Sequence, residues 1–413
     1  MKKAKLSGIL SLLLAVSVTG CAAPAEDLMK NITPNPVYAR ELESVSDAAV
    51  TDFSVRLFQH SLTEGENTLI SPLSVLAALS MTANGAKGET LAQMEAVMGM
   101  PVEELNTWLH IYMANLPETE KYKLNIANSI WFTDKESFTV NEDFLQTNAD
   151  YYHAGIYKAP FDDTTKDAIN DWVEENTDGM IRNILDEIPE DAVMYLVNAL
   201  AFDAEWQETY STYRIQEGRF TTENGRVCEV EMMYSDEHSY LEDDQATGFL
   251  KYYAGGKYAF AALLPEEGGS VTEYAASLTG EHLHTLLTSA SAETVETAIP
   301  KFETEYDVEM REILEEMGMP VAFGDAADFT GLGVSEDGPV CIGRVLHKTM
   351  ICVNEKGTKA GASTVVEMVA ETCMEGPEQE PKRVYLDRPF VYMLIDCETM
   401  VPLFMGTMMD PVG

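Results

Sequence analysis

Residues 355–364 read Glu-Lys-Gly-Thr-Lys-Ala-Gly-Ala-Ser-Thr, and this stretch is the most informative one for the fold. From Gly357 onward, alternate residues form two sets, termed files, that would point to opposite faces of a strand. Every charged residue up to residue 370 belongs to the same file. Such alternation is typical of a strand with one buried and one solvated face. The uncharged file comprises Thr358, Ala360, Ala362, Thr364, Val366 and Met368.

The same stretch also has the composition of an exposed loop. Its residues are small and polar, and it leads into an acidic segment with a Gly-Pro pair at 375–381. Glycine and proline in that context favour turns and loops over regular structure. A segment that suits both a loop and a strand indicates a conformational switch, with an ordinary flexible linker as the alternative interpretation.

Length and composition indicate a large folded protein with a negative surface. The chain has 413 residues, of which 46% are hydrophobic and 23% charged, so a substantial core can form. The formal net charge of −42 argues against binding to nucleic acids or to anionic membranes by charge attraction. Because no linker after residue 46 is long enough to separate domains, we expect one folded unit over 47–413.

The N-terminus has the pattern of an export signal. Lysines within the first five residues precede an apolar stretch over 9–18, which is too short to span a bilayer. The following residues, Val-Thr-Gly-Cys at 18–21, resemble the lipobox of bacterial lipoproteins. The resemblance implies that residues 1–20 are a signal peptide and that Cys21 is acylated.

An ordinary secretory signal cleaved near Ala23 is the alternative interpretation of this leader. Residues 21–46 are rich in Ala, Pro and Asn and are predicted to form a tether. We therefore expect an exported protein, either secreted or held at the cell surface, that contacts the membrane only through a lipid anchor.

Five cysteines follow Cys21, an odd number without the close spacing of a disulfide framework or a zinc site. Four lie in apolar, strand-like contexts and are predicted to be small core side chains: Cys228, Cys341, Cys352 and Cys397. Cys373 is either a reactive thiol or a tolerated loop residue. His282 and His284 are predicted to lie on a helix surface, and no metal or other cofactor is expected.

Hydrophobic periodicity predicts mainly helices in the first half of the chain and mainly strands in the second. Ser71-Pro72 is typical of a helix start. Helices are predicted over 72–84, 89–98 and 163–179, the last capped by Asp163 or Thr164. Strands are predicted over 193–202, 257–265, 390–395 and 401–405. This distribution favours an α+β architecture with large mixed or antiparallel sheets.

The hinge pattern Glu-x-Gly-Thr-x-Ala at 355–360 resembles that of the serpins, a family of serine protease inhibitors. Further segments resemble serpin motifs in the same order along the chain, from about residue 48 to the C-terminus. They lie at 70–74, 169–181, 196–206, 299–302, 322–332, 347–348, 387–390 and 402–406. The resemblance implies a fold of about nine helices and three β-sheets, with a reactive loop at about 355–386 that can insert into the main sheet.

The resemblance also implies three groups of functional residues. The hinge comprises Glu355, Gly357, Thr358, Ala360 and Ala362. The shutter, a polar cluster beneath the middle of the main sheet, comprises Ser71, Ser74, Asn198 and His347. The breach, where the loop enters the sheet, comprises Trp206, Lys301 and Glu355. The alternative interpretation of the shutter is a hydrogen-bonded core network without a switching role. The alternative for Lys301 is a solvated charge at the end of a strand.

In serpins a target protease attacks the loop, forms an acyl-enzyme and is trapped when the loop inserts as a new strand. Since the uncharged file contains no proline, we expect an inhibitor. Family spacing from Gly357 implies a scissile bond between Glu371 and Thr372. Because the loop is longer than usual before Pro389, three other bonds are also candidates for cleavage: the bond after Ala370, the bond between Thr372 and Cys373, and the bond after Met374.

The loop sequence favours some target proteases over others. A glutamate before the bond suits a protease with a basic specificity pocket, whereas the apolar residues upstream suit elastase-like or subtilisin-like enzymes. No Lys or Arg lies within 360–381, which argues against a trypsin-like target.

Other partners and activities have little support in the sequence. No heparin-type cofactor is expected, since acidic residues follow Gly88 where heparin-binding serpins have a basic helix: Glu89, Glu95, Glu103 and Glu104. No catalytic motif such as Gly-x-Ser-x-Gly or His-Glu-x-x-His is present, so an enzyme is not expected. We expect a monomer that forms a covalent complex with its protease, with a non-inhibitory cell-surface binding protein as the alternative.

Overall fold

The computed structural model describes residues 25–37, 44–116, 119, 121–135, 137–189, 192–336, 338–358 and 381–412. This part of the chain contains nine α-helices, three large β-sheets and a small sheet of two strands. The α+β architecture predicted from the sequence is therefore confirmed. Residues 1–24 and residues 359–380, which hold most of the predicted reactive loop, lie outside the described residues.

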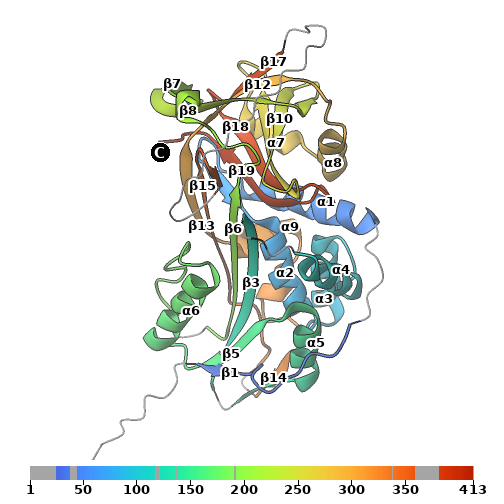
Figure 1. Ribbon diagram of the computed structural model, residues 1–413. Coiled ribbons are helices and arrows are strands. Elements are labelled where there is room, and N and C mark those ends of the chain that lie inside the picture. Colours follow the sequence, from blue (N-terminus) through green and yellow to red (C-terminus); the bar gives the residue numbers. More distant parts are fainter. Residues whose placement is uncertain are drawn as a thin grey trace, which may run out of the picture.

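A seven-stranded sheet runs along the length of the molecule, in the order β1-β5-β3-β6-β16-β15-β13 (Figure 1). Its central strand β6 (Met194–Glu205) is formed by the apolar run predicted at 193–202. The other strands are β1 (Glu26–Asp27), β3 (Tyr122–Thr133), β5 (Gly155–Ala159), β13 (Phe302–Glu309), β15 (Arg344–Val353) and β16 (Gly357–Thr358).

Two further large sheets lie above and behind the main one (Figure 1). The six-stranded sheet has the order β2-β19-β18-β11-β10-β9, and the four-stranded sheet the order β17-β12-β8-β7. The strands of the six-stranded sheet are β2 (Thr68–Ile70), β9 (Tyr240–Glu242), β10 (Ala246–Tyr252), β11 (Tyr258–Pro265), β18 (Phe390–Asp396) and β19 (Pro402–Met408). Those of the four-stranded sheet are β7 (Ile215–Thr221), β8 (Val227–Glu237), β12 (Val295–Pro300) and β17 (Lys382–Tyr385). The small sheet pairs β4 (Phe138–Val140) with β14 (Gly333–Ser335). The predicted hairpin over 390–405 is β18 with β19.

Helices cover both faces of the main sheet (Figure 1). The helices of the described residues are α1 (Ser44–Ser61), α2 (Pro72–Ala83), α3 (Gly88–Met98), α4 (Val102–Ala114), α5 (Glu142–Tyr152), α6 (Asp163–Asn176), α7 (Val271–Ser277), α8 (Gly280–Thr288) and α9 (Arg311–Met317), with 3₁₀ turns at η1 (Thr212–Arg214) and η2 (Pro320–Phe323). Of these, α7 and α8 pack on strands of the six-stranded sheet instead. α2 starts at its predicted Pro72, and every one of its residues is buried. No helix in the described ranges combines the length and apolarity needed to cross a membrane.

α6 packs on the face of the main sheet opposite α2 and creates a second hydrophobic cluster (Figure 1). Its apolar residues Ile169 and Val173 are fully buried there together with Tyr195 and Val197 of β6. The helix is capped by Asp162, whose carboxylate accepts hydrogen bonds from two backbone N–H groups of the first turn. The predicted caps, Asp163 and Thr164, are therefore wrong by one or two positions.

Residues 25–37 belong to the stretch predicted to be a tether, yet they pack against the fold. β1 pairs antiparallel with β5 at the edge of the main sheet, and the Leu28 N–H donates to Ile156 O at 2.9 Å. Further along, both the backbone N–H and the side-chain amide of Asn35 donate to the carboxylate of Asp150. Any free tether before β1 therefore ends near Ala25.

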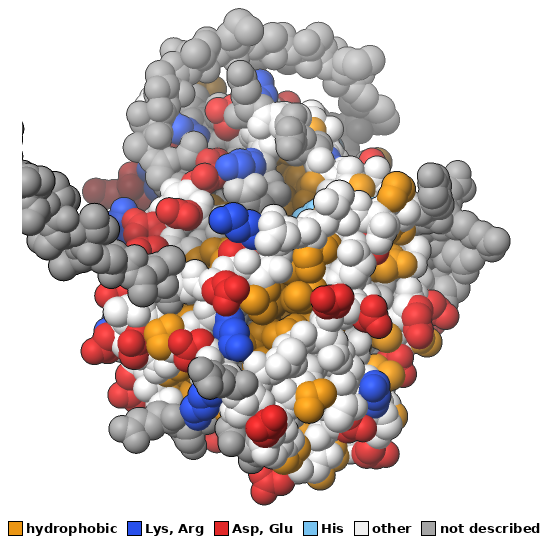
Figure 2. All heavy atoms as spheres, turned by 90° about the horizontal axis from the view of Figure 1, so that it is seen from below, with side chains coloured by type: hydrophobic (Ala, Val, Ile, Leu, Met, Phe, Trp, Pro, Cys, Tyr) orange, Lys and Arg blue, Asp and Glu red, His pale blue; other side chains and the backbone are white. Residues whose placement is uncertain are grey.

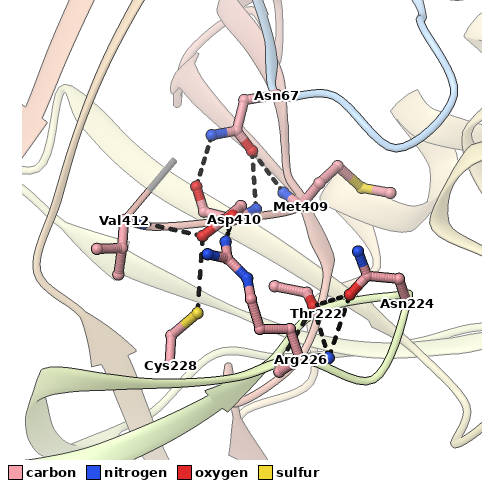
Figure 3. Close-up of polar contacts among 8 residues, drawn as sticks. All are labelled: Asn67, Thr222, Asn224, Arg226, Cys228, Met409, Asp410 and Val412. Carbon is pink, nitrogen blue, oxygen red and sulfur yellow. Dashed lines mark hydrogen bonds and ion pairs between the residues drawn. The ribbon is translucent and has the colours of Figure 1, made fainter.

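The C-terminal segment is fastened by a polar cluster around Asp410 (Figure 3). The side chain of Asn67 accepts hydrogen bonds from the backbone N–H groups of Met409 and Asp410, at 2.7 and 3.0 Å, and donates to Asp410 O at 2.7 Å. Arg226 forms an ion pair with the Asp410 carboxylate, and Cys228 Sγ lies 3.8 Å from the same group. These contacts join the chain end to β8 and to the segment before β2.

Candidate functional site at the opening of the main sheet

The hinge enters the main sheet where two strands separate. β6 and β15 pair with each other in parallel over four residue pairs, the last of which joins Asn198 and His347. Beyond this pair the strands diverge, and β16 lies between them with Thr358 opposite Ala204 on one side and Val353 on the other. The hinge residues Gly357 and Thr358 therefore already pair where an inserted strand would begin.

Gly357 is required by its close approach to β6. A Cβ at this position would lie 1.9 Å from the carbonyl oxygen of Ala204, well inside van der Waals contact. Any side chain would push the hinge away from the strand, so glycine is selected here for backbone proximity.

Thr358 points into the molecule, as the alternation of side chains predicted. Only 1% of its surface is exposed, and its hydroxyl shares a hydrogen bond with the hydroxyl of Tyr253. The Tyr253 ring in turn stacks on Trp206, with ring centroids 4.4 Å apart. The inward file thus begins in a pocket already lined by aromatic side chains.

Trp206 and Tyr210 hold the turn that leads into the hinge. The indole N–H of Trp206 donates to Asn354 O at 2.8 Å, and its backbone N–H donates to Lys356 O at 2.8 Å. The backbone N–H of Tyr210 donates to Glu355 O at 2.9 Å. Trp206 therefore lies at the loop entry, as the resemblance implied.

Lys301 and Glu355 form the predicted ion pair at this entry. Lys301 Nζ lies 3.0 Å from Glu355 Oε2 and 3.4 Å from Glu231 Oε2. Burial alone would raise the pKa of Glu355, but a backbone N–H and the Lys301 ammonium outweigh burial and lower that pKa below its ordinary value. Because both side chains keep some exposure, the pair contributes about 0–1 kcal/mol.

A second ion pair at the entry was not predicted from the sequence. Lys251 of β10 is only 2% exposed, and its Nζ lies 2.6 Å from Glu237 Oε1. The ammonium also lies 5.4 Å from the ring centroid of Trp206 and 4.5 Å from that of Tyr210. Lys251 thus supports both residues that hold the hinge turn, through charge and cation–π contact.

The shutter residues meet beneath the point where β6 and β15 part. His347 Nε2 accepts a hydrogen bond from the backbone N–H of Ser71 at 3.0 Å, so Nε2 carries no proton. His347 Nδ1 lies 2.9 Å from Asn198 Oδ1 and must donate to it. The two contacts fix a neutral tautomer, and complete burial lowers the pKa of His347 to about 3.

This histidine should make the native fold sensitive to acid. The pKa of His347 is about 3 in the native state and about 6.5 in the unfolded state. Between these values the unfolded state binds a proton that the native state does not bind. The free energy of unfolding is therefore highest above pH 6.5 and decreases as the pH falls. The expected loss is about 1.4 kcal/mol per pH unit below 6.5, or about 2 kcal/mol at pH 5. Urea unfolding between pH 7.5 and 5 measures it, and His347→Gln should show a correspondingly shallower slope; equal slopes would contradict the prediction.

The shutter network is incomplete in this state. Three buried polar atoms of the shutter have no hydrogen-bond partner within the described residues: Ser71 Oγ, Ser74 Oγ and Asn198 Nδ2. The same holds for Oδ1 of the neighbouring Asn128, which lies opposite Asn198 on β3. A buried polar atom without a partner costs about 1–3 kcal/mol. If β6 and β15 parted, a polar side chain entering between them would offer these atoms a partner.

The remaining candidate residues lie away from this opening or outside the described ranges. Cys228 is buried as predicted, whereas three predicted core thiols are only half-buried, all of them free: Cys341, Cys352 and Cys397. His282 lies on α8 beside Asp243, and no cluster of metal-ligating side chains occurs in the described part of the chain. Ala360, Ala362 and every candidate for the scissile bond fall within 359–380.

Comparison with known proteins agrees with this architecture. The family model for serpins, the serine protease inhibitors, matches residues 48–411. The chain belongs to the serpin family. A serpin-like protein of Thermococcus kodakarensis is 30% identical over 88% of this chain and 85% of its own length. The alpha-1-antiproteinase of Rattus norvegicus is 27% identical over 97% of this chain and 98% of its own length.

Solved serpin structures superpose closely on the chain. The solved chain of the thermophilic serpin tengpin in its native state is 46% identical, with a TM-score of 0.89, and the match covers 94% of this chain and 100% of that one. Tengpin in its latent state gives a lower TM-score of 0.80 at the same identity. Human thyroxine-binding globulin, solved with its ligand, shares the fold at 23% identity and a TM-score of 0.79.

Proposed function

We propose that this serpin inhibits serine proteases by suicide-substrate trapping. The target protease cleaves the reactive loop, and its catalytic serine becomes acylated by the new carboxyl end. The loop then inserts between β6 and β15 before the ester is hydrolysed. The hinge held between these strands, with an uncharged file behind it, supports this mechanism over that of a static binding protein.

The register of the hinge carries the proposal. Thr358 stands opposite Ala204 on β6 and Val353 on β15, both antiparallel to β16. Continued pair by pair, this register would bring Thr364 opposite both Asn198 and His347. A threonine hydroxyl would then reach the shutter, where buried polar atoms lack partners.

The energetics favour insertion. About ten further residues would pair on both sides, and ladder hydrogen bonds contribute ~0.5–1.5 kcal/mol each, so the gain is on the order of 10 kcal/mol. The opposing cost is separation of the four parallel residue pairs between β6 and β15, and parallel pairing is the weaker kind. Burial of the larger inward side chains, Val366 and Met368, adds roughly 1.5–3 kcal/mol each.

The bond after Glu371 is our first candidate for cleavage, followed by the bonds after Ala370, Thr372 and Met374. The purified protein should be incubated with elastase-like, subtilisin-like, glutamate-specific and trypsin-like proteases. We expect complexes that survive denaturing gels with one or more of the first three classes. Sequencing the peptide released from a complex identifies the bond, and cleavage by every protease without complex would contradict the proposal.

A carrier or binding role is the second candidate, since thyroxine-binding globulin shares the fold. A carrier of this kind would not need an uncharged inward file, nor a hinge already seated in the sheet. In the protease panel, a carrier would be cut as an ordinary substrate.

We also propose that the protein is exported and anchored through an acylated Cys21, as the lipobox-like residues 18–21 indicate. Three or so acyl chains, at ~0.8 kcal/mol per buried methylene, would hold it firmly at a membrane. Mass spectrometry of the mature N-terminus distinguishes acylated Cys21 from a free N-terminus near Ala23.

A further inference from the structure

Lys251 occupies an exceptional place for a charged side chain. Charged side chains normally stay in contact with water, and Figure 2 shows them spread over the face of the molecule seen from below. Among the described residues, Lys251 is the one Lys or Arg that is buried. Burying an ammonium costs free energy unless close partners compensate it, so the contacts of Lys251 decide what it does.

The Lys251 ammonium lies one contact away from the hinge. Its Nζ lies 2.6 Å from Glu237 Oε1 and also over the rings of Trp206 and Tyr210. Both aromatic residues donate backbone N–H groups to carbonyl oxygens of the hinge turn at 355–356. Lys251 itself does not need to touch the hinge to influence it, because it fixes the two residues that do.

A serine extends this cluster toward the other end of the reactive loop. Ser235 Oγ lies 2.6 Å from Glu237 Oε1 and 3.3 Å from the Tyr210 hydroxyl. It also lies 3.0 Å from the hydroxyl of Thr297, which is 1% exposed. Thr297 of β12 pairs with Val384 of β17, the strand that follows the predicted loop. One buried network therefore contacts the segments that carry both ends of the loop.

We propose that Lys251 is a positioning residue for loop insertion, an inference that rests on the proposed trapping function. Through Trp206 and Tyr210 it keeps Gly357 and Thr358 paired in the main sheet while the protease attacks. Insertion then begins from residues that are already in place. Without this hold the hinge turn moves freely, and its backbone must be ordered again before the first pair can form. Insertion is then slower, and more acyl-enzyme is lost to hydrolysis.

The Lys301–Glu355 pair at the same entry cannot replace this hold. Its two side chains are 24% and 34% exposed, whereas those of Lys251 and Glu237 are 3% and 13% exposed. Water and salt screen an exposed pair, and a buried polar network is screened much less. The hold by Lys251 should therefore persist at high ionic strength.

The charge of Lys251 offers a readout that a purely structural role would not affect. Burial alone would lower the pKa of Lys251, but Tyr210 and Glu237 together raise it above its ordinary value, with a smaller contribution from Glu208. Lys251 therefore stays charged at neutral and mildly alkaline pH. In a Glu237→Gln variant the buried carboxylate is gone, so burial should bring the pKa of Lys251 down and release its proton as the pH rises.

The first test is Lys251→Met, which keeps the approximate length of the side chain and removes its charge. The ratio of hydrolysed to trapped acyl-enzyme should rise about tenfold, because a desolvated cation over two rings is lost. This ratio follows from the stoichiometry of inhibition with a protease that the wild type traps. The initial rate of loop cleavage should stay within about twofold of the wild type.

The matched control is Lys257→Met. Lys257 is a lysine with a 14% exposed side chain, and it also pairs with two carboxylates, those of Asp396 and Glu398. It precedes β11 and has no contact with the hinge turn among these pairs. The variant should lower the melting temperature and leave the ratio of hydrolysis to trapping unchanged.

Glu237→Gln provides a second test that does not depend on the folding of Lys251→Met. Its ratio of hydrolysis to trapping, divided by that of the wild type at each pH, should rise between pH 6.5 and 9.5. In the double variant Lys251→Met with Glu237→Gln, the same quotient should be independent of pH.

Three results would overturn the proposal alone while wild-type trapping persists. They are an unchanged ratio in folded Lys251→Met, a pH-independent quotient in Glu237→Gln, and a rise in Lys257→Met equal to that in Lys251→Met. A wild type that forms no complex with any protease would instead overturn the proposed function together with this inference, so the two failures are distinguishable.

Discussion

Thr358→Arg should turn the inhibitor into a substrate. The wild-type side chain is 1% exposed and hydrogen-bonded to Tyr253, so an arginine at this position would place an unpaired charge beneath the sheet. If the cost of insertion rises by about 3 kcal/mol, insertion slows roughly 150-fold, and hydrolysis of the acyl-enzyme overtakes it. The measurement is the stoichiometry of inhibition with a protease that the wild type traps.

The control for this variant is Lys359→Arg, which places the same side chain in the outward file. It should leave the stoichiometry within about twofold of the wild type. Gel-stable complexes formed by Thr358→Arg in wild-type yield would contradict the inward placement of this file.

Thr364→Lys should arrest insertion part-way down the sheet. The register predicts that residue 364 arrives between Asn198 and His347, in a fully buried polar cluster with no acidic side chain among its named members. A lysine cannot be neutralised there without cost, whereas the threonine hydroxyl could bond to partner-free atoms of the shutter. We expect cleavage at the wild-type rate and loss of most covalent complex.

Ser363→Lys introduces the same charge one residue earlier, in the outward file, and should trap proteases normally. A reversed result, with Ser363→Lys inactive and Thr364→Lys active, would mean that the register is shifted by one residue. Equal activity of the two variants would mean that this part of the loop does not enter the sheet.

Local sequence patterns predicted those helices and strands that have a clear start signal or one face that must be buried. The Ser-Pro start of α2, the apolar run of β6 and the alternation at Thr358 each reflect a backbone rule or a face that must avoid water. The shutter and breach depended on the family resemblance instead, because their members come from distant segments. The structure places Asn198, His347 and Lys301 with the partners that the resemblance implied.

Other features could not be predicted because they depend on tertiary contacts. Lys251 lies on β10 of the six-stranded sheet and Glu237 at the end of β8 in the four-stranded sheet, so their pairing depends on how the two sheets meet. A lysine within a short strand gives no sign that it will be buried beside two aromatic rings. The packing of residues 25–37 depends on an available edge at β5, which a polar, Pro-containing stretch does not reveal. The scissile bond could not be predicted because the loop is longer than the family pattern before Pro389, so that counting from Gly357 does not fix its position.

The central claim is that the loop can become a strand of a sheet that folds without it, and thermal unfolding of loop-cleaved protein tests it most directly. The protein should be nicked within 360–371 by a protease that it does not trap, and its melting temperature compared with that of the intact protein. A gain on the order of 10 kcal/mol corresponds to a rise of roughly 10–15 °C for a fold of this size. Such a rise is the predicted result, whereas a nicked protein that melts at or below the temperature of the intact one would contradict the account.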